Sequence, residues 1–377
     1  MSQSKPNILF LATEYDAPGM RPYARTIINN MWQEGDRVLI VTRYGADLTA
    51  FPGIPADAFT WIDYPTGLIS KALFRFLPTS VTSALKQMVS RLDIDVVYSL
   101  TGELILAGSV RKLQQKVPLL FTVHDAVYHD YKFSNVLQWV KDRLIIARPH
   151  RLMLERTRHQ VTNSREQLEL VTRLFPDHQV HYAPFPTLVN DVILRGGKQV
   201  QELQSVDGGY ILFFGTLHLY KGVHLLYEAY LSHPELQSRP LVIAGTKNIY
   251  FERRPDEKGV IWINRFVEDS EVADLFSRAA VVVYPYISAT QSGVASIASC
   301  FGKPMVLSDL PFFRQTCSGY DGVEFFPAGD SEALAAAITR SLQSPGSTSE
   351  LYRREYAPQV MRETLEGIIA STIKSTD

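Results

Sequence analysis

The chain has 377 residues, of which 46% are hydrophobic and 20% charged, as in a globular protein long enough for two domains. Its formal net charge of −1 gives no electrostatic argument for nucleic-acid binding, so we expect no nucleic-acid partner. Two cysteines, Cys300 and Cys317, are too few for a disulfide framework and indicate a reducing compartment. The apolar run near the N-terminus is too short for a signal peptide, and no stretch approaches the ~20 apolar residues of a membrane span. We therefore expect a cytoplasmic protein.

In the first half of the chain, short apolar runs alternate with amphipathic segments. The runs predict buried strands at NILFLA (7–12), RVLIVT (37–42), DVVYSL (95–100) and PLLFTVH (118–124). Residues 21–35 and 79–92 show helical patterns between them. Strands separated by helices of this length predict a parallel sheet built from βαβ units.

The same alternation resumes in the second half of the chain. It predicts strands at YILFFG (210–215), PLVIAG (240–245), VIWINRF (260–266), AAVVVYPY (279–286) and KPMVLSD (303–309). We therefore predict an α/β protein of two Rossmann-like, doubly wound domains, residues 1–186 and 208–357. Prolines and two Gly-Gly pairs predict a linker at 187–207. A helix at 358–377, beginning at Pro358, is predicted to pack back on the first domain.

Two such domains leave a cleft at the carboxyl ends of their strands, where ligands of open α/β sheets bind. The strand YILFFG runs into GTLHLYKG and then a helix. Gly215 would permit close backbone approach, and Lys221 at the helix start would favour a phosphate. The P-loop spacing is absent, and a solvated helix-end lysine is the alternative reading of Lys221.

Two loops of the first half carry further candidates. His124 ends a predicted strand, with Asp125 after it, and could hydrogen-bond a sugar hydroxyl or a leaving oxygen. Since most isolated histidines do nothing catalytic, a structural role is the alternative. Gly19 would let a phosphate or sugar approach backbone N–H groups, with Arg21 close by. No G-x-G-x-x-G motif supports a dinucleotide cofactor.

The stretch YPYISATQSGV (284–294) leaves a valine-rich strand and precedes a predicted helix. It presents the side chains of Thr290, Gln291 and Ser292 and the Gly293 N–H. Hydroxyls, an amide and free N–H groups at a helix start can bind an anion. The alternative is an ordinary turn in which Ser or Thr caps the helix.

The sequence gives no sign of a metal or cofactor site. Asp93 and Asp95 form a D-x-D motif, but they precede a strand and so lie at the wrong edge of the sheet for a metal–diphosphate site. No His, Cys and carboxylate cluster has metal-ligand spacing. We therefore predict no metal and no cofactor.

Taken together, these pieces resemble the retaining glycosyltransferases of family 4, which have the GT-B fold. FFGTLHLYKGVHLLYEAY (213–230) is similar to that family's strand–Gly–loop–Lys-Gly–helix. LVIAG (241–245), INRFVEDSEVADLFSRAAVVVYP (263–285), FGKPMVLSD (301–309) and PAGDSEALAAAI (327–338) follow in the family's order. The likeness spans nearly the whole chain, and it is specific because of the order and spacing of its pieces.

The sequence departs from the family pattern in two places. The family commonly has a basic pair on the donor diphosphate; Lys221 matches the second member, whereas Thr216 stands at the usual arginine position. The family's two glutamates, eight positions apart, are replaced by Ala289 and Ile297. The chain thus resembles a branch with Ala-Thr-Gln-Ser-Gly here, in which neutral hydroxyls and amides would hold the diphosphate.

The resemblance implies transfer of a sugar from a nucleotide-diphosphate donor to a glycan or lipid-linked acceptor, with retention, in surface polysaccharide or glycoconjugate synthesis. The C-terminal domain would bind the nucleotide sugar through Gly215, Thr216, Lys221, Thr290, Gln291, Ser292 and Gly293, and the N-terminal domain would bind the acceptor. His124 would orient the sugar, Lys221 would stabilise the leaving diphosphate, and Arg265 would line the nucleobase or phosphate side of the cleft. The leaving phosphate would itself take the acceptor's proton, and no metal is needed.

Two other functions stay open. The missing glutamates suggest a non-catalytic GT-B protein that partners or regulates an active transferase. A nucleotide-sugar epimerase on the same fold should show catalytic carboxylates or further basic residues in the cleft. Segments 67–89 and 134–159 mix Arg and Lys with Leu, Phe and Trp. They fit either amphipathic helices packed on the sheet or peripheral contact with the inner face of the cell membrane.

Overall fold

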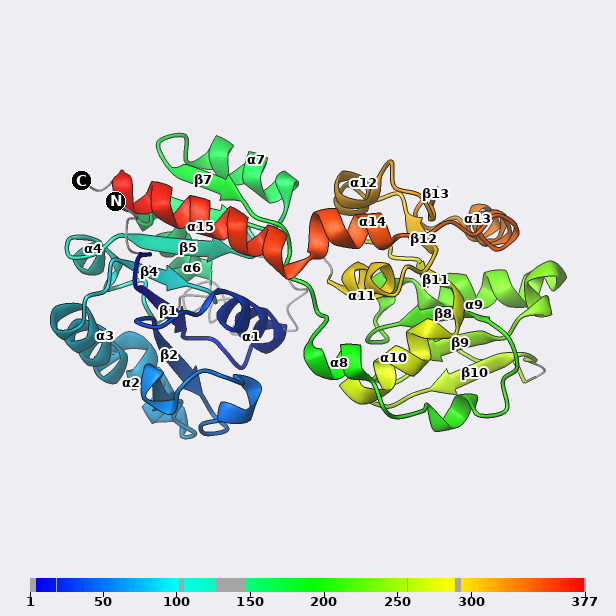
Figure 1. Ribbon diagram of the computed structural model, residues 1–377, viewed down its shortest axis with the longest axis horizontal. Coiled ribbons are helices and arrows are strands. Elements are labelled where there is room, and N and C mark those ends of the chain that lie inside the picture. The colour runs from blue at the N-terminus through cyan, green and yellow to red at the C-terminus, as the bar shows by residue number, and fades with distance from the viewer. Residues whose placement is uncertain are drawn as a thin grey trace. The chain divides into compact units, whose positions relative to one another are not determined.

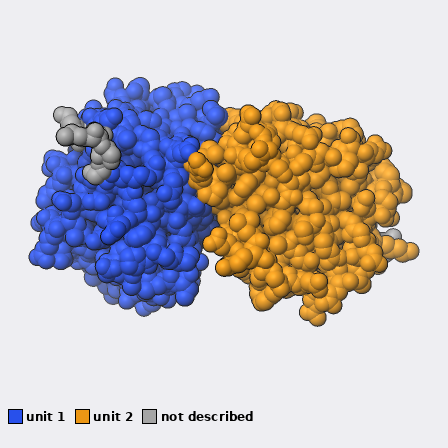
Figure 2. Space-filling model, in the orientation of Figure 1, with its two compact units in different colours: residues 1–186, 361–377 blue, residues 187–360 orange. Residues whose placement is uncertain are grey.

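The computed structural model describes residues 5–17, 19–101, 105–126, 147–255, 257–288 and 293–375. The chain divides into two compact units (Figure 2). The first comprises Met1–Pro186 together with Met361–Asp377, and the second comprises Thr187–Val360. Each contains one parallel sheet with helices around it, so the predicted architecture of two doubly wound α/β domains is confirmed (Figure 1).

The first unit is built on a seven-stranded sheet in the order β3-β2-β1-β4-β5-β6-β7. Its strands are β1 (Ile8–Ala12), β2 (Arg37–Thr42), β3 (Phe59–Asp63), β4 (Val96–Ser99), β5 (Leu119–Val123), β6 (His159–Thr162) and β7 (Gln179–Tyr182). All neighbouring pairs run parallel. Successive strands extend the sheet to one side from β1 to β3 and to the other side from β4 to β7. The loops after β1 and β4 therefore lie at the switch point where doubly wound sheets bind ligands.

Helices cover both faces of this sheet, which is why its inner strands are apolar along their whole length. In β1, Phe10 packs with α1 (Met20–Met31) and α15 (Pro358–Lys374), whereas Leu9 and Leu11 pack on the opposite face. That second face is covered by α3 (Thr79–Arg91), α4 (Val110–Gln114), α6 (Arg148–Arg156) and α7 (Arg165–Leu174). The last helix of the chain therefore completes the core of the first unit.

The second unit has a six-stranded parallel sheet in the order β10-β9-β8-β11-β12-β13. Its strands are β8 (Tyr210–Phe214), β9 (Leu241–Ala244), β10 (Val260–Ile263), β11 (Ala279–Tyr284), β12 (Met305–Ser308) and β13 (Val323–Phe326). Its helices are α8 (Asp191–Arg195), α9 (Val223–Ser232), α10 (Asp269–Ser277), α11 (Val294–Cys300), α12 (Pro311–Cys317), α13 (Ser331–Gln343) and α14 (Ser349–Leu351). The order reverses beside β8, which makes the loops after β8, β9 and β11 the candidate binding loops.

The segment predicted as a linker, 187–207, is instead part of the second unit. Asn190 caps α8 by accepting hydrogen bonds from the N–H groups of Val192 and Ile193. Ile193 and Leu203 are buried in the core of this unit. The Gly-Gly pairs therefore shape turns on a packed surface, and the crossing between units falls at Pro186 and Thr187.

Candidate active site

The loops after β8 and β9 touch backbone to backbone. Gly215 has φ of +146°, and a side chain at Gly245 would place Cβ 1.8 Å from the Gly215 carbonyl oxygen. The Leu217 N–H donates to the Thr246 carbonyl at 2.8 Å. Only glycines permit this approach, which locks the two loops together at the carboxyl end of the sheet.

The turn that carries Lys221 is braced against the loop after β11. Gly222 has φ of +65°, and a Cβ there would lie 1.8 Å from the Pro285 carbonyl oxygen. The Ile287 N–H donates to the Tyr220 carbonyl at 2.8 Å. A single turn of 3-10 helix, Leu219–Lys221, is thus fixed between β8 and β11 and presents its lysine at a defined place.

Lys221 lies in an environment that disfavours its own charge. Its Nζ donates to the Tyr286 hydroxyl at 2.6 Å and lies 3.9 Å from the Tyr286 ring centroid. Within the described ranges no carboxylate lies within ion-pair distance of it, and burial lowers the pKa of Lys221 to about 8. An ammonium that is partly stripped of water and unmatched by an acid favours an incoming anion.

A second lysine lies on the neighbouring loop. Lys247 follows β9 and has φ of 84°, a left-handed backbone that is costly for a residue with a Cβ. Its Nζ lies 2.6 Å from His218 Nε2. Burial, with the charges of Lys247 and Lys221, lowers the pKa of His218, so the ring is neutral and accepts from Lys247. We call His218, Lys221 and Lys247 the basic cluster.

The strained backbone at Lys247 is held by the end of β10. The Asn264 side-chain amide, with its nitrogen turned to the two carbonyls, donates to Lys247 O at 2.9 Å and to Gly245 O at 3.3 Å. Sequence reasoning missed Lys247 and His218. The available signal was a lysine two residues past the buried stretch PLVIAG, at the carboxyl edge of the sheet.

Of the other two residues predicted to bind the donor, Thr216 is exposed, whereas Arg265 is paired with carboxylates. Thr216 is exposed on the loop after β8, next to Gly215. Arg265 binds two carboxylates in forked geometry, with contacts of 2.8–2.9 Å to Glu202 and 2.7–2.8 Å to Glu271. These pairs tie β10 to α10 and to the 187–207 segment, and they account for Arg265 as a structural residue.

The start of α11 is described only in part. Thr290, Gln291 and Ser292, like Ala289, lie outside the described residues. Gly293 is the N-terminal flanking residue of α11 and accepts from the Ser296 N–H at 3.0 Å. Ile297, at one of the two glutamate positions of the family pattern, is 3% exposed in the core.

In the first unit, His124 directly follows β5. Its Nε2 lies 2.9 Å from the Leu100 carbonyl, so Nε2 carries the proton. The Nδ1 atom is buried with no hydrogen-bond partner in the described ranges, and the ring meets Tyr23 edge-on at 4.7 Å. Burial lowers the pKa of His124, so the ring is neutral. In this conformation neither nitrogen is available to a sugar, and a role in transfer requires the ring to turn.

The other predicted residues of the first unit flank α1 and β5. Gly19, with φ of 81°, lies at the N-terminal end of α1 and is exposed. Arg21 binds Asp16 through Nε at 3.0 Å and Nη2 at 2.5 Å. The Asp125 carbonyl accepts from His150 Nε2 at 2.7 Å. Arg21 therefore fixes the loop after β1 through Asp16.

No metal-binding group of three or more His, Cys, Asp or Glu residues occurs in the described part of the chain. The basic cluster, by contrast, gathers two cations at the switch point of the second sheet. Lysine ammonium groups at such a place can bind an anion through ion pairs and hydrogen bonds.

Two protein-family models match the chain, one on each unit. Residues 208–344 match the glycosyl transferases group 1, and residues 18–186 match the glycosyl transferase 4-like domain. Together the two matches take in most of the chain. No curated protein is similar enough to the chain to match it.

Solved structures match over almost the whole length. Sucrose-phosphate synthase from Thermosynechococcus elongatus is 17% identical, with a TM-score of 0.62, and the match covers 99% of this chain and 95% of that one. HepE from Anabaena, solved with UDP, is 15% identical with a TM-score of 0.68 and coverage of 97% and 100%. A UDP-forming trehalose-phosphate synthase from Burkholderia vietnamiensis is 14% identical, with a TM-score of 0.68 and coverage of 98% and 100%. These likenesses show the fold, and with the two family models they identify the chain as a glycosyltransferase of the GT-B type.

Proposed function

We propose that the protein transfers a sugar from a nucleotide-diphosphate donor to a glycan or lipid-linked acceptor, with retention of configuration and without a metal ion. The second unit binds the donor diphosphate at the basic cluster, and the first unit binds the acceptor. Synthesis of a surface polysaccharide or glycoconjugate is the process that such an activity serves.

One observation carries this proposal, the environment of Lys221. Its ammonium is partly desolvated, has no acidic partner within the described ranges, and is held by a turn that two backbone contacts fix in place. This ammonium is preorganised to bind an anion, because folding has already removed part of its water, and the free energy of that desolvation is not lost again on binding. Lys247 adds a second cation where Thr216 leaves the family's arginine position neutral.

The comparisons support uracil as the base of the donor. HepE from Anabaena was solved with UDP and also with UDP-glucose, at 16% identity and a TM-score of 0.65 for the latter. UDP-glucose is therefore the first donor to test with this chain.

The proposed chemistry places charge stabilisation at the leaving group. As the bond from the sugar to the diphosphate breaks, negative charge grows on the phosphate oxygen, and Lys221 and Lys247 stabilise it. The same oxygen takes the proton of the attacking acceptor hydroxyl, so no carboxylate base is needed. Thr290, Gln291 and Ser292, with the Gly293 N–H, complete the donor contacts in this proposal.

Calorimetry with UDP in the presence of a chelator tests donor binding. Lys221→Ala removes a charge-assisted contact worth about 1.5–3 kcal/mol, so affinity should fall roughly 10- to 150-fold. Lys258→Ala is the matched control, because Lys258 is exposed and precedes β10, at the amino end of the strands. Binding that requires added metal, or equal effects of the two changes, would contradict the proposal.

Turnover separates the three candidate functions. A transferase consumes UDP-sugar only when an acceptor is present and releases UDP. Interconversion of the sugar without an acceptor would favour an epimerase. Tight UDP binding with no turnover on any glycan or lipid extract would favour the non-catalytic partner.

Peripheral membrane contact is supported by α2 (Leu68–Phe76). Ile69 is 79% exposed, and Leu73 and Leu77 are 55% and 64% exposed at four-residue spacing. An apolar stripe of this kind lies readily in the headgroup region of a bilayer. In the described residues no helix is long and apolar enough to cross a membrane. Flotation with anionic vesicles should carry the protein and lose the Ile69→Gln, Leu73→Gln variant; equal flotation of both would end this proposal.

A further inference from the structure

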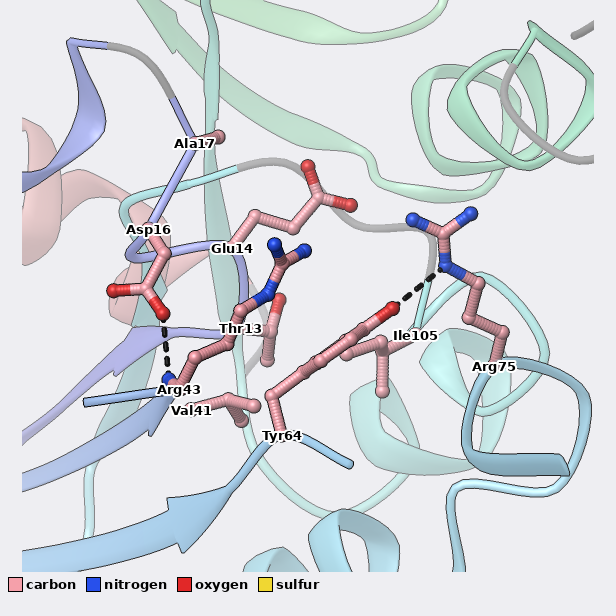
Figure 3. Close-up of a pocket in the computed structure, with 9 residues that line it drawn as sticks. All are labelled: Thr13, Glu14, Asp16, Ala17, Val41, Arg43, Tyr64, Arg75 and Ile105. Carbon is pink, nitrogen blue, oxygen red and sulfur yellow. Dashed lines mark hydrogen bonds between the residues drawn. The ribbon is translucent and has the colours of Figure 1, made fainter. Parts of the chain in front are cut away.

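A cavity with its own chemistry lies wholly inside the first unit. It has a volume of about 270 Å³ and opens among the loops after β1, β2 and β3 (Figure 3). Val41 and Ile105 supply apolar surface, while Glu14, Asp16, Arg43 and Arg75 supply charge. Its volume lies just below the roughly 300–1,000 Å³ of pockets for drug-sized ligands, which suits a ligand of monosaccharide size.

Two arginines converge on one aromatic ring in this cavity. The Arg43 guanidinium carbon lies 4.8 Å from the centroid of the Tyr64 ring. Arg75 Nε donates to the Tyr64 hydroxyl at 3.0 Å. Figure 3 shows both guanidinium groups and the Glu14 carboxylate directed to the same side of the cavity. The ring thus orients both cations toward a common space.

The backbone around the ring is fixed independently of any ligand. Asp16 Oδ2 accepts from the Arg43 N–H at 2.6 Å, and the Tyr64 N–H donates to the Thr42 carbonyl at 2.8 Å. Asp16 Oδ1 also accepts from both Nε and Nη2 of Arg21. The loops after β1, β2 and β3 are therefore tied to one another before anything binds.

The charges of the cavity do not cancel within the described residues. The Asp16 charge is matched by Arg21, which does not line the cavity. Arg43 and Arg75 have no carboxylate within ion-pair distance in the described ranges, whereas Arg25 and Arg151 of the same unit each pair with an acid. Of the two carboxylates that line the cavity, Asp16 is thus matched by an arginine outside the lining, which leaves Arg43 and Arg75 against Glu14, and the balance favours an anion.

We propose that this cavity binds the acceptor sugar through a negatively charged group on it, a phosphate or a carboxylate. Arginine matches both anions with paired N–H donors, and the Arg43 and Arg75 side chains hold such donors beyond those that contact Tyr64. The apolar patch of Val41 and Ile105 meets the ring carbons of the sugar. The identification of this ligand as the acceptor rests on the proposed transferase function; the binding site itself does not.

Calorimetry without any nucleotide tests the site directly, with four probes. Glucose 1-phosphate carries its anion where a lipid-linked sugar does, glucose 6-phosphate and glucuronate carry it at the opposite end, and glucose carries none. At least one anionic probe should bind at least about tenfold more tightly than glucose. The affinity should fall as salt is added, because the contact is ionic. The preferred probe then identifies which end of the acceptor is charged.

Variants decide whether the arginines are responsible. The double variant Arg43→Gln, Arg75→Gln should bind the anionic probe at least about tenfold more weakly. This lower limit corresponds to the loss of one charge-assisted contact. Arg111→Gln, an exposed arginine on α4 away from the cavity, should change nothing. The affinity for UDP should be the same in all three proteins, which also verifies that they are folded.

Three results would overturn this proposal. They are equal binding of glucose and the anionic sugars, full affinity in the double variant, and no saturable binding of any anionic probe. If instead the proposed transferase function is wrong, the results differ: UDP would fail to bind, while the anionic sugar would still bind at Arg43 and Arg75.

Discussion

At the scale of single residues, the candidate donor site depends on two lysines in unfavourable states. Lys221 carries a charge that burial opposes, and Lys247 has a backbone that its own side chain opposes. Ionisable groups with shifted pKa values and residues with unfavourable backbone angles both occur often at functional sites, where the surrounding contacts stabilise them. Lys221 could be predicted from the sequence because it precedes a helix in a familiar pattern. Lys247 could not, because its relevance depends on β9 lying beside β8.

The lowered pKa of Lys221 predicts the pH dependence of donor binding. Its folded-state pKa of about 8 lies below the ordinary 10.5, so the ammonium deprotonates as pH rises through about 8. UDP affinity should therefore decline between pH 7 and 9.5, a range above the second ionisation of a phosphate near 6. The apo protein gains stability between pH 8 and 10.5, since the unfolded chain binds the extra proton there.

Lys221→Arg supplies the control for this titration, because arginine keeps its charge over the whole range. Its UDP affinity should be flat from pH 7 to 9.5, whatever its absolute value. Calorimetry at several pH values checks both proteins. A parallel decline in both would assign the titration to another group.

Lys247→Asn separates strain from function at the second lysine. Asparagine tolerates a left-handed backbone, so relief of strain costing roughly 1–2 kcal/mol should raise the melting temperature of the second unit by about 2–8 °C. UDP affinity should fall by roughly fivefold, less than for Lys221, because Lys247 is exposed and its charge is screened. Lys247→Arg should keep the affinity. A variant that is less stable, or that binds UDP as the parent does, would contradict this account.

At the scale of elements, most of the strands that the sequence predicted are buried on both faces, and the exception is β10, an edge strand whose run VIWI is apolar throughout. β1, β2, β8 and β11 are continuous apolar runs, and each lies between two neighbours. The strands it missed include β3, β7 and β13 at the edges of the sheets, where half-buried side chains interrupt the pattern. β6 was missed for a different reason, since it buries His159 and Gln160 inside the sheet. An edge strand is therefore predictable from its own residues only where, as in β10, it keeps a continuous apolar run.

The turn between β8 and α9 offers a test at this scale, through two glycines with similar backbone. Gly222→Ala would place Cβ 1.8 Å from the Pro285 carbonyl oxygen, whereas Gly208→Ala, with φ of 83°, meets nothing within 4 Å. Gly208→Ala should cost about 1 kcal/mol from its dihedral angle alone. Gly222→Ala should cost more than about 3 kcal/mol and weaken UDP binding, because Lys221 adjoins it. Thermal melting and UDP calorimetry measure both; equal effects would show that the Pro285 contact is not what fixes the turn.

At the scale of the whole molecule, the two units have separate cores, and the chain returns to the first unit at its end. Met361, Leu365, Ile368 and Ile369 of α15 are buried with β1 and α1. The predicted linker failed at this scale, because prolines and glycines mark turns as readily as domain boundaries. Only the burial of Ile193 and Leu203 reveals that 187–207 belongs to the second core.

Leu365→Ala tests whether α15 stabilises only the first unit and leaves the stability of the second unchanged. Leu365 is 1% exposed, and removal of such a side chain leaves a cavity that costs about 2–5 kcal/mol. Because its contacts lie in the core of the first unit, hydrogen exchange should quicken in β1 and stay unchanged in β8. Gly367→Ala is the opposing control, since Gly367 is exposed, its added Cβ meets nothing within 4 Å, and alanine favours the helix by up to about 1 kcal/mol. That variant should slow exchange in β1 or leave it as it is. Equal acceleration in β1 and β8 after Leu365→Ala would mean that the two cores unfold as one, and the division of stability between the units would have to be abandoned.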